Sequence, residues 1–113
     1  MATPTSRTLD YYRQQGMPIE VVEKWNQWSK IRQDLFGFAD LVTFDGQAVY
    51  LVQATSTGNM SARVKKILAN PTAELWVQNK NRKIIVIGWR KYAQAKDGKW
   101  WRETIREITK EDF

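Results

Sequence analysis

The chain has 113 residues and a hydrophobic fraction of 42%, which suits one folded domain with a modest core. It contains no cysteine and no histidine, which excludes disulfide bonds, thiolate and imidazole metal ligands, and any histidine-based general base. No apolar run reaches the about 18 residues of a membrane span, and the N-terminal segment MATPTSRTLD lacks the apolar centre of a signal peptide. Any catalysis must therefore use carboxylates, amides, hydroxyls, lysine or arginine.

The net charge of +6 is concentrated in the C-terminal half. From Arg63 onward there are 13 Lys and Arg against 6 Asp and Glu, whereas the preceding residues carry 5 against 6. A basic half favours a polyanionic partner, nucleic acid first. The alternative is that these charges only keep an exposed surface hydrated.

The N-terminal segment predicts a helix. We expect residues 1–5 to be frayed and either Thr5 or Ser6 to act as the N-cap. The helix then runs to about Gln15, and Gly16 ends it.

The next segments are less clear. Residues 19–25 have apolar spacing that suits a helix or a strand, and their β-branched residues favour a strand. Residues 26–33 are polar and predict a loop or the tip of a hairpin. Gly37 then allows a bend or a close backbone approach before the central strand.

The strongest local signal is Asp45-Gly46 between two apolar runs, because this dipeptide favours a two-residue hairpin loop. That loop would pair Asp40 with Leu51. Side chains alternate across a strand, so Asp40, Gln53 and Thr55 would share one end of an otherwise apolar face. Asp40 and Gln53 would be diagonal neighbours about 7 Å apart or less.

The C-terminal half predicts two helices and a strand pair. A helix is expected from about Met60 to Ala69, and a shorter one from Asn70-Pro71 to about Gln78, with Asn70 as its N-cap. The apolar run 84–87 predicts a strand buried on both faces. The last strand follows a second hairpin loop and has the charged character of a sheet edge.

These elements predict a single α/β domain over residues 1–113. Its order is α-β-β-β-α-α-β-β, with a mixed central sheet flanked by helices.

The pattern G-x-x-D, a hairpin, an apolar strand and a helix resembles the PD-(D/E)XK nuclease superfamily. It is most similar to small Holliday-junction-resolvase-type members and short phage proteins. Gly37 to Asp40 supplies the first half of the motif and Leu51 to Ser56 the second, and the resemblance covers about residues 34–67. The sequence departs from the pattern at Gln53, where the family has an acid, and at Thr55, where it has a lysine.

The resemblance implies a weakly bound Mg²⁺ or Mn²⁺ ion. Asp40 would be its main ligand and a catalytic residue, and Gln53 would add an uncharged amide oxygen. Asp34 is a further candidate metal ligand and Glu23 a further catalytic acid. The alternatives are that Asp40 bonds turn amides at the start of a strand and that Gln53 is a satisfied buried amide.

Thr55 stands at the position of the family's lysine but cannot supply its positive charge. Lys66 on the following helix is the first candidate replacement, and Arg63 is the second. The alternative is that both lie on a solvated face of the helix.

Basic side chains along the chain are candidates for phosphate contacts. They are Lys30, Arg32, Arg63, Lys65, Lys80, Arg82, Lys83, Arg90, Lys91 and Arg102. Trp100 or Trp101 could stack on bases, or each could belong to the core.

The resemblance implies a metal-dependent DNA endonuclease that acts on branched or recombining DNA. It also implies a homodimer in the cytoplasm of a bacterium or a phage-infected host cell. Two alternatives stay open: a nuclease-fold protein that binds nucleic acid without cutting it, and a phage accessory protein that binds a host protein.

Overall fold

The fold is built on a five-stranded mixed sheet with the strand order β1-β4-β5-β6-β7. The computed structural model describes residues 2 to 113. The strands of this sheet are β1 (Ile19–Val21), β4 (Leu41–Phe44), β5 (Val49–Ser56), β6 (Arg82–Lys96) and β7 (Lys99–Ile108). Strands β5 and β6 are parallel, and the other neighbours are antiparallel. Two further strands, β2 (Lys24–Asn26) and β3 (Ile31–Gln33), form a separate antiparallel ribbon.

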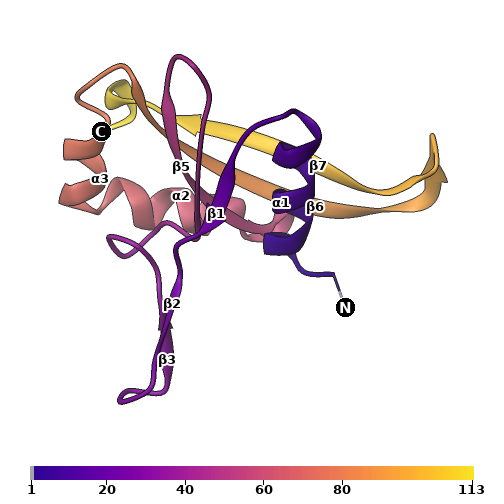
Figure 1. Ribbon diagram of the computed structural model, residues 1–113, viewed down its shortest axis with the longest axis horizontal. Helices are drawn as coiled ribbons and strands as arrows, with labels where there is room; N and C mark the ends of the chain where they lie inside the picture. The colour runs from indigo at the N-terminus through magenta and orange to yellow at the C-terminus, as the bar shows by residue number, and fades with distance from the viewer. Residues whose placement is uncertain (1) are drawn as a thin grey trace.

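Helices cover both faces of the sheet (Figure 1). They are α1 (Pro4–Gln14), α2 (Met60–Leu68) and α3 (Pro71–Trp76), with the short 3₁₀ helices η1 (Thr57–Asn59) and η2 (Lys110–Asp112). Ile84 and Val86 pack with α2 and α3, whereas Ile85 and Ile87 pack with Tyr12 of α1. This alternation confirms the predicted doubly buried strand, and the layers confirm the predicted α/β fold with a mixed sheet between helices.

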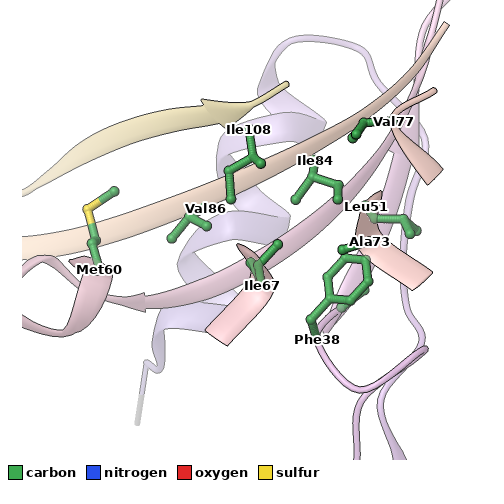
Figure 2. Packing of buried hydrophobic residues seen from close by; sticks show 10 residues of the cluster. Phe38, Leu51, Met60, Ile67, Ala73, Val77, Ile84, Val86 and Ile108 are labelled. Carbon is green, nitrogen blue, oxygen red and sulfur yellow. The ribbon is translucent and has the colours of Figure 1, made fainter. Parts of the chain in front are cut away.

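The larger core lies between the sheet and helices α2 and α3, and Figure 2 shows its side chains meeting from both layers. Ile67 of α2 and Leu51 of β5 are almost fully buried there. Phe38 inserts into the same core from the loop before β4 and is only 1% exposed. Its burial fixes the chain two residues before Asp40.

Helix α1 begins earlier than the sequence predicted. Its N-cap is Thr3, whose side chain accepts a hydrogen bond from the Ser6 N–H at 3.1 Å, while the Ser6 Oγ accepts one from the Thr3 N–H at 2.8 Å. Pro4 occupies the first helical turn, where its missing N–H costs nothing. The segment that we expected to be frayed is therefore capped helix from Thr3 onward, and Met1 lies outside the described residues. Gly16 follows the helix with a φ of 77°, as predicted.

Residues 19–25 form strand structure, as favoured, but two short strands replace the single one that we expected. The chain breaks at Val22 and Glu23, whose N–H groups both donate to the Asp40 carbonyl. It then leaves the sheet as β2 and returns as β3. Residues 27–30 form the predicted hairpin tip, but residues 31–33, which we expected in the same loop, form strand β3. Figure 1 shows the ribbon projecting away from the body of the protein.

The central hairpin has a different loop from the predicted one. Phe44 pairs with Val49, so the loop holds the residues 45–48 rather than Asp45-Gly46 alone. The Asp45 carboxylate accepts hydrogen bonds from the Gln47 and Ala48 N–H groups at 2.8 and 2.9 Å, and this side-chain turn replaces a tight backbone turn. A shift of two residues keeps every side chain on the predicted face.

The remaining elements agree with the sequence. Asn70 caps α3 by accepting from the Thr72 and Ala73 N–H groups, although α3 ends slightly before the predicted residue. Asp97 and Gly98 have φ values of 52° and 74° and form the predicted two-residue loop between β6 and the edge strand β7. None of the helices formed by residues 2 to 113 combines the length and the apolar character that crossing a bilayer requires.

Candidate functional site

Three carboxylates converge at the end of the sheet. Glu23 follows β1, Asp34 follows β3 and Asp40 precedes β4, and each has an oxygen within 4.8 Å of the others. They line a cavity of about 470 Å³ together with Gln53 and Arg63. Segments that are separate in the sequence therefore bring three acidic side chains and one arginine to the same cavity.

Asp40 is the most buried acid of this cluster, with 5% of its surface exposed. Its Oδ2 accepts hydrogen bonds from Gln53 Nε2 at 2.7 Å and from the Ala54 N–H at 3.1 Å. Burial, followed by the hydrogen bond and the negative charge of Asp34, raises the pKa of Asp40 to about 8, although the Ala54 N–H opposes this rise. Near neutral pH the cluster therefore retains a proton unless a cation replaces it.

Glu23 is held at the site by its backbone and by an ion pair. Its N–H donates to the Asp40 carbonyl at 3.3 Å, and its carboxylate accepts from Arg32 Nη1 at 2.8 Å. Arg32 comes from β3, so this ion pair ties the ribbon to the cavity wall. A phosphate that contacts Arg32, as we predicted, would therefore compete with Glu23 for the guanidinium group.

Asp34 is positioned by a tight loop between β3 and β4. Gly37 has a φ of 83° and Phe36 a φ of 56°, and the Gly37 N–H donates to the Asp34 carbonyl at 3.2 Å. The Asn70 side chain, which caps α3, also donates to the Phe36 carbonyl at 2.9 Å. The bend predicted at Gly37 is present, and it holds Asp34 toward Asp40.

Gln53 and Thr55 lie on β5 and are 4% and 5% exposed. Both line the same cavity as Asp40, which confirms the predicted shared face. When the observed register is continued by one residue, Gln53 lies directly opposite Asp40 rather than diagonal to it. The Gln53 amide is therefore already used as a hydrogen-bond donor to the principal acid.

The candidate cations divide between neighbouring recesses. Arg63, in the first half of α2, lines the cavity of Asp40. Lys66 lies nearly one turn further along α2 and lines an adjoining recess with Asp34 and Arg32. Lys65 points to a third recess on an apolar side of the helix. Arg63, our second choice, therefore shares a cavity with Asp40, whereas Lys66, our first choice, does not.

The basic residues at the start of β6 lie far from this site. Arg82 pairs with Val49, the first residue of β5, whereas Gln53 and Thr55 of the site lie toward the last residue of that strand. Arg82 Nε donates to the Trp76 carbonyl at 2.8 Å, and Lys83 pairs with Glu107 at 3.7 Å. Arg82 therefore ties α3 to the sheet, and Lys80, Arg82 and Lys83 line one recess that does not include the acids.

The predicted contacts Arg90, Lys91 and Arg102 lie together on the extended part of the β6–β7 hairpin. Arg90 and Arg102 are direct cross-strand partners. Trp100 beside them is 50% exposed, whereas Trp101 is half-buried beneath the Arg7 guanidinium at 3.6 Å. Trp101 is therefore part of the packing, and Trp100 is open to a partner.

Sequence reasoning did not unite Glu23, Asp34 and Asp40, because their contact depends on how the ribbon leaves and rejoins the sheet. The donors fit a hard divalent cation such as Mg²⁺ or Mn²⁺, which prefers carboxylate and amide oxygens. No protein-family model, no curated protein and no solved structure matches the chain.

Proposed function

We propose that the protein is a metal-dependent DNA endonuclease of the PD-(D/E)XK type. The observation that carries this proposal is the convergence of Glu23, Asp34 and Asp40 around one cavity that Arg63 also lines. Carboxylates this close repel one another unless one is protonated or a cation lies between them. The strand order leading to the cavity, with an antiparallel β1-β4-β5 unit followed by α2, also supports the resemblance.

The metal would be held mainly by Asp40 and Asp34. Gln53 would contribute its amide oxygen after a rotation of the amide, because its nitrogen now faces Asp40. When bound, a divalent ion supplies an activated water and screens the charge that develops on the phosphate. Gln53 would coordinate the ion through an uncharged oxygen, where the resembled family has a carboxylate. We therefore expect the site to bind a divalent ion weakly.

The protein side chains would position the substrate. Arg63 lines the cavity from α2, and it would contact the scissile phosphate. Lys66 lies in the adjoining recess, where it could contact the next phosphate along the strand. Glu23 keeps Arg32 directed toward the cavity through their 2.8 Å ion pair.

DNA is the proposed substrate because the sheet extends into a basic hairpin. Arg90 faces Arg102 and Lys96 faces Lys99 across β6 and β7. Like charges directly opposite one another destabilise a strand pair, so these pairs favour a polyanion that screens them. Branched DNA and a homodimer are part of the proposal through the resemblance to resolvases.

A cleavage assay tests the proposal. Labelled linear, flapped and four-way DNA should be incubated with the protein and Mg²⁺ or Mn²⁺, with EDTA as the control. We expect cleavage only with the metal. If no substrate is cut at any metal concentration, the endonuclease proposal fails.

A second candidate function is DNA binding without cleavage. The 2.7 Å hydrogen bond from Gln53 to Asp40 favours it, because this bond satisfies the acid within the protein. A salt-sensitive mobility shift without metal-dependent cutting would identify this function.

A further inference from the structure

The β2–β3 ribbon with its connecting turn, residues 24–33, is called the arm here. It projects from the body of the protein in Figure 1. Its large apolar side chains face solvent: Trp28 is 88% exposed, Trp25 60% and Ile31 54%. Soluble surfaces seldom display two tryptophans so openly without a partner.

The tip of the arm is an ordered turn. Asn26 Oδ1 accepts hydrogen bonds from the Trp28 and Ser29 N–H groups at 2.9 and 3.1 Å. The Lys30 N–H donates to the Asn26 carbonyl at 2.8 Å, and Lys30 adopts a φ of 60° to close the turn. The backbone of Trp28 is therefore held in place, so its indole can bind a partner with little loss of backbone freedom.

The charge of the arm favours a polyanionic partner. Lys24, Lys30 and Arg32 lie within it, and it contains no acidic residue. Trp25 pairs across the ribbon with Arg32, so both side chains lie on one face, and Arg32 also lines the acid cavity. Aromatic rings interleaved with basic groups are the arrangement that stacks on bases and holds the adjoining phosphates.

The arm also starts and ends at the candidate site. Glu23 immediately precedes β2, and Asp34 immediately follows β3. A strand rises about 3.3 Å per residue, so the tip lies roughly 10–15 Å from these acids. That distance corresponds to a few nucleotides of a strand whose phosphate lies in the cavity.

We propose that the arm recognises unpaired bases of DNA, with Trp28 and Trp25 as stacking surfaces and Lys24 and Lys30 as phosphate contacts. This inference rests on the proposed function, since it takes the substrate to be DNA bound at the acid cavity. It names the substrate class: DNA with a flap, a gap or an opened junction, in preference to fully paired duplex.

Equilibrium binding in EDTA tests the inference without cleavage. Fluorescence anisotropy should compare a flapped DNA with a blunt duplex of the same length for the wild type, Trp28→Ala and Trp28→Phe. Phe44→Ala is the matched control, because Phe44 is also an exposed aromatic residue but lies beside the first residue of β5, at the end of the sheet opposite the acid cavity.

We expect Trp28→Ala to weaken binding to flapped DNA about 10-fold, which is within the range for losing one base stack. Binding to the blunt duplex should change less than about 2-fold. Trp28→Phe should restore most of the affinity, because any aromatic ring provides a stacking face. Phe44→Ala should leave the preference for flapped DNA unchanged, and circular dichroism should show the same fold for all variants.

Equal binding of flapped DNA by the wild type and Trp28→Ala would overturn the inference. So would a loss of self-association in Trp28→Ala, measured by sedimentation, with DNA binding unchanged, because the arm would then contact a second copy of the chain. If the wild type prefers flapped DNA but never cuts it with Mn²⁺, the endonuclease proposal fails and the inference about the arm stands.

Discussion

Gln53 donates its side-chain amide to Asp40 at 2.7 Å across two adjacent strands, and both residues are at least 95% buried. A glutamate at position 53 would place a second carboxylate where the donor now lies. Two buried carboxylates at that distance cannot both ionise without a cation.

We therefore predict that Gln53→Glu destabilises the protein without metal and binds divalent ions more tightly. In EDTA the loss should be at least about 1 kcal/mol, or about 4–8 °C in Tm for a domain of this size. Added Mn²⁺ should raise the Tm of Gln53→Glu more than that of the wild type. Equal shifts with Mn²⁺ in thermal melts would show that position 53 does not face the metal.

Asp40→Asn should abolish metal-dependent cleavage and leave DNA binding nearly intact. The change is nearly isosteric, and the basic side chains proposed to contact phosphates on the β6–β7 hairpin are unchanged. Cleavage and mobility-shift assays on the same preparation separate the two effects. Asp10→Asn, on the surface of α1, is the control, and cutting by Asp40→Asn at the wild-type rate would contradict the site assignment.

The free energy of unfolding should fall as pH rises from about 4 to about 8. Burial beside Asp34 raises the pKa of Asp40 from its ordinary 3.8 to about 8 in the folded protein, so the folded state binds this proton more tightly in that window. The chain has no histidine, so no histidine titrates in the same window.

Urea denaturation in EDTA at several pH values measures this slope. Asp40→Asn should flatten it, because the variant has no proton to lose at position 40. A wild-type slope that is zero, or equal to that of Asp40→Asn, would show that Asp40 ionises normally.

Arg102→Gln should weaken DNA binding and leave the fold as stable as before, or more stable by a few tenths of a kcal/mol. Its partner Arg90 lies directly opposite, and removing a like charge relieves their repulsion. The slope of log affinity against log salt should fall by about 1. Lys65→Gln is the control, because it removes the same charge from α2, outside the acid cavity. An equal loss of affinity in Lys65→Gln would mean that the hairpin is not a specific contact.

Gly88→Ala should destabilise the protein by about 1–3 kcal/mol. A Cβ at this position would overlap Met60 Sδ and lie 2.9 Å from Thr57 Cα. The Met60 side chain can move, but the backbone of Thr57 belongs to η1 and yields less easily. Gly58→Ala is the control because nothing lies within 4 Å of its added Cβ, and equal Tm values for the two variants would contradict the packing.

Local signals predicted most of the secondary structure. Asn70-Pro71 and Asp97-Gly98 specify their cap and their turn through chemistry within a few residues, so both predictions are confirmed. The loop after β4 was predicted wrongly, because the Asp45 side chain accepts two backbone N–H groups and lengthens the turn. The shared face of Asp40 and Gln53 was nevertheless correct, since the register moved by an even number of residues.

The full acid cluster could not be predicted from the sequence. Glu23 reaches Asp40 because the chain breaks between β1 and β2, and Asp34 reaches it because Asn70 holds the Phe36 carbonyl. Both contacts depend on tertiary packing. The choice between Arg63 and Lys66 likewise depends on the rotation of α2 relative to the sheet, which spacing within the helix does not define.

The arm can change in length without disturbing the acids at its base. Lys24 and Gln33 are paired next to Glu23 and Asp34, so the separation of the two acids is set where the ribbon begins. Residues inserted or deleted as opposing pairs would alter the reach by about 3.4 Å per pair while preserving which side chains share a face. Under the proposal for the arm, its length would therefore set how many nucleotides separate the bases it stacks on from the acid cavity.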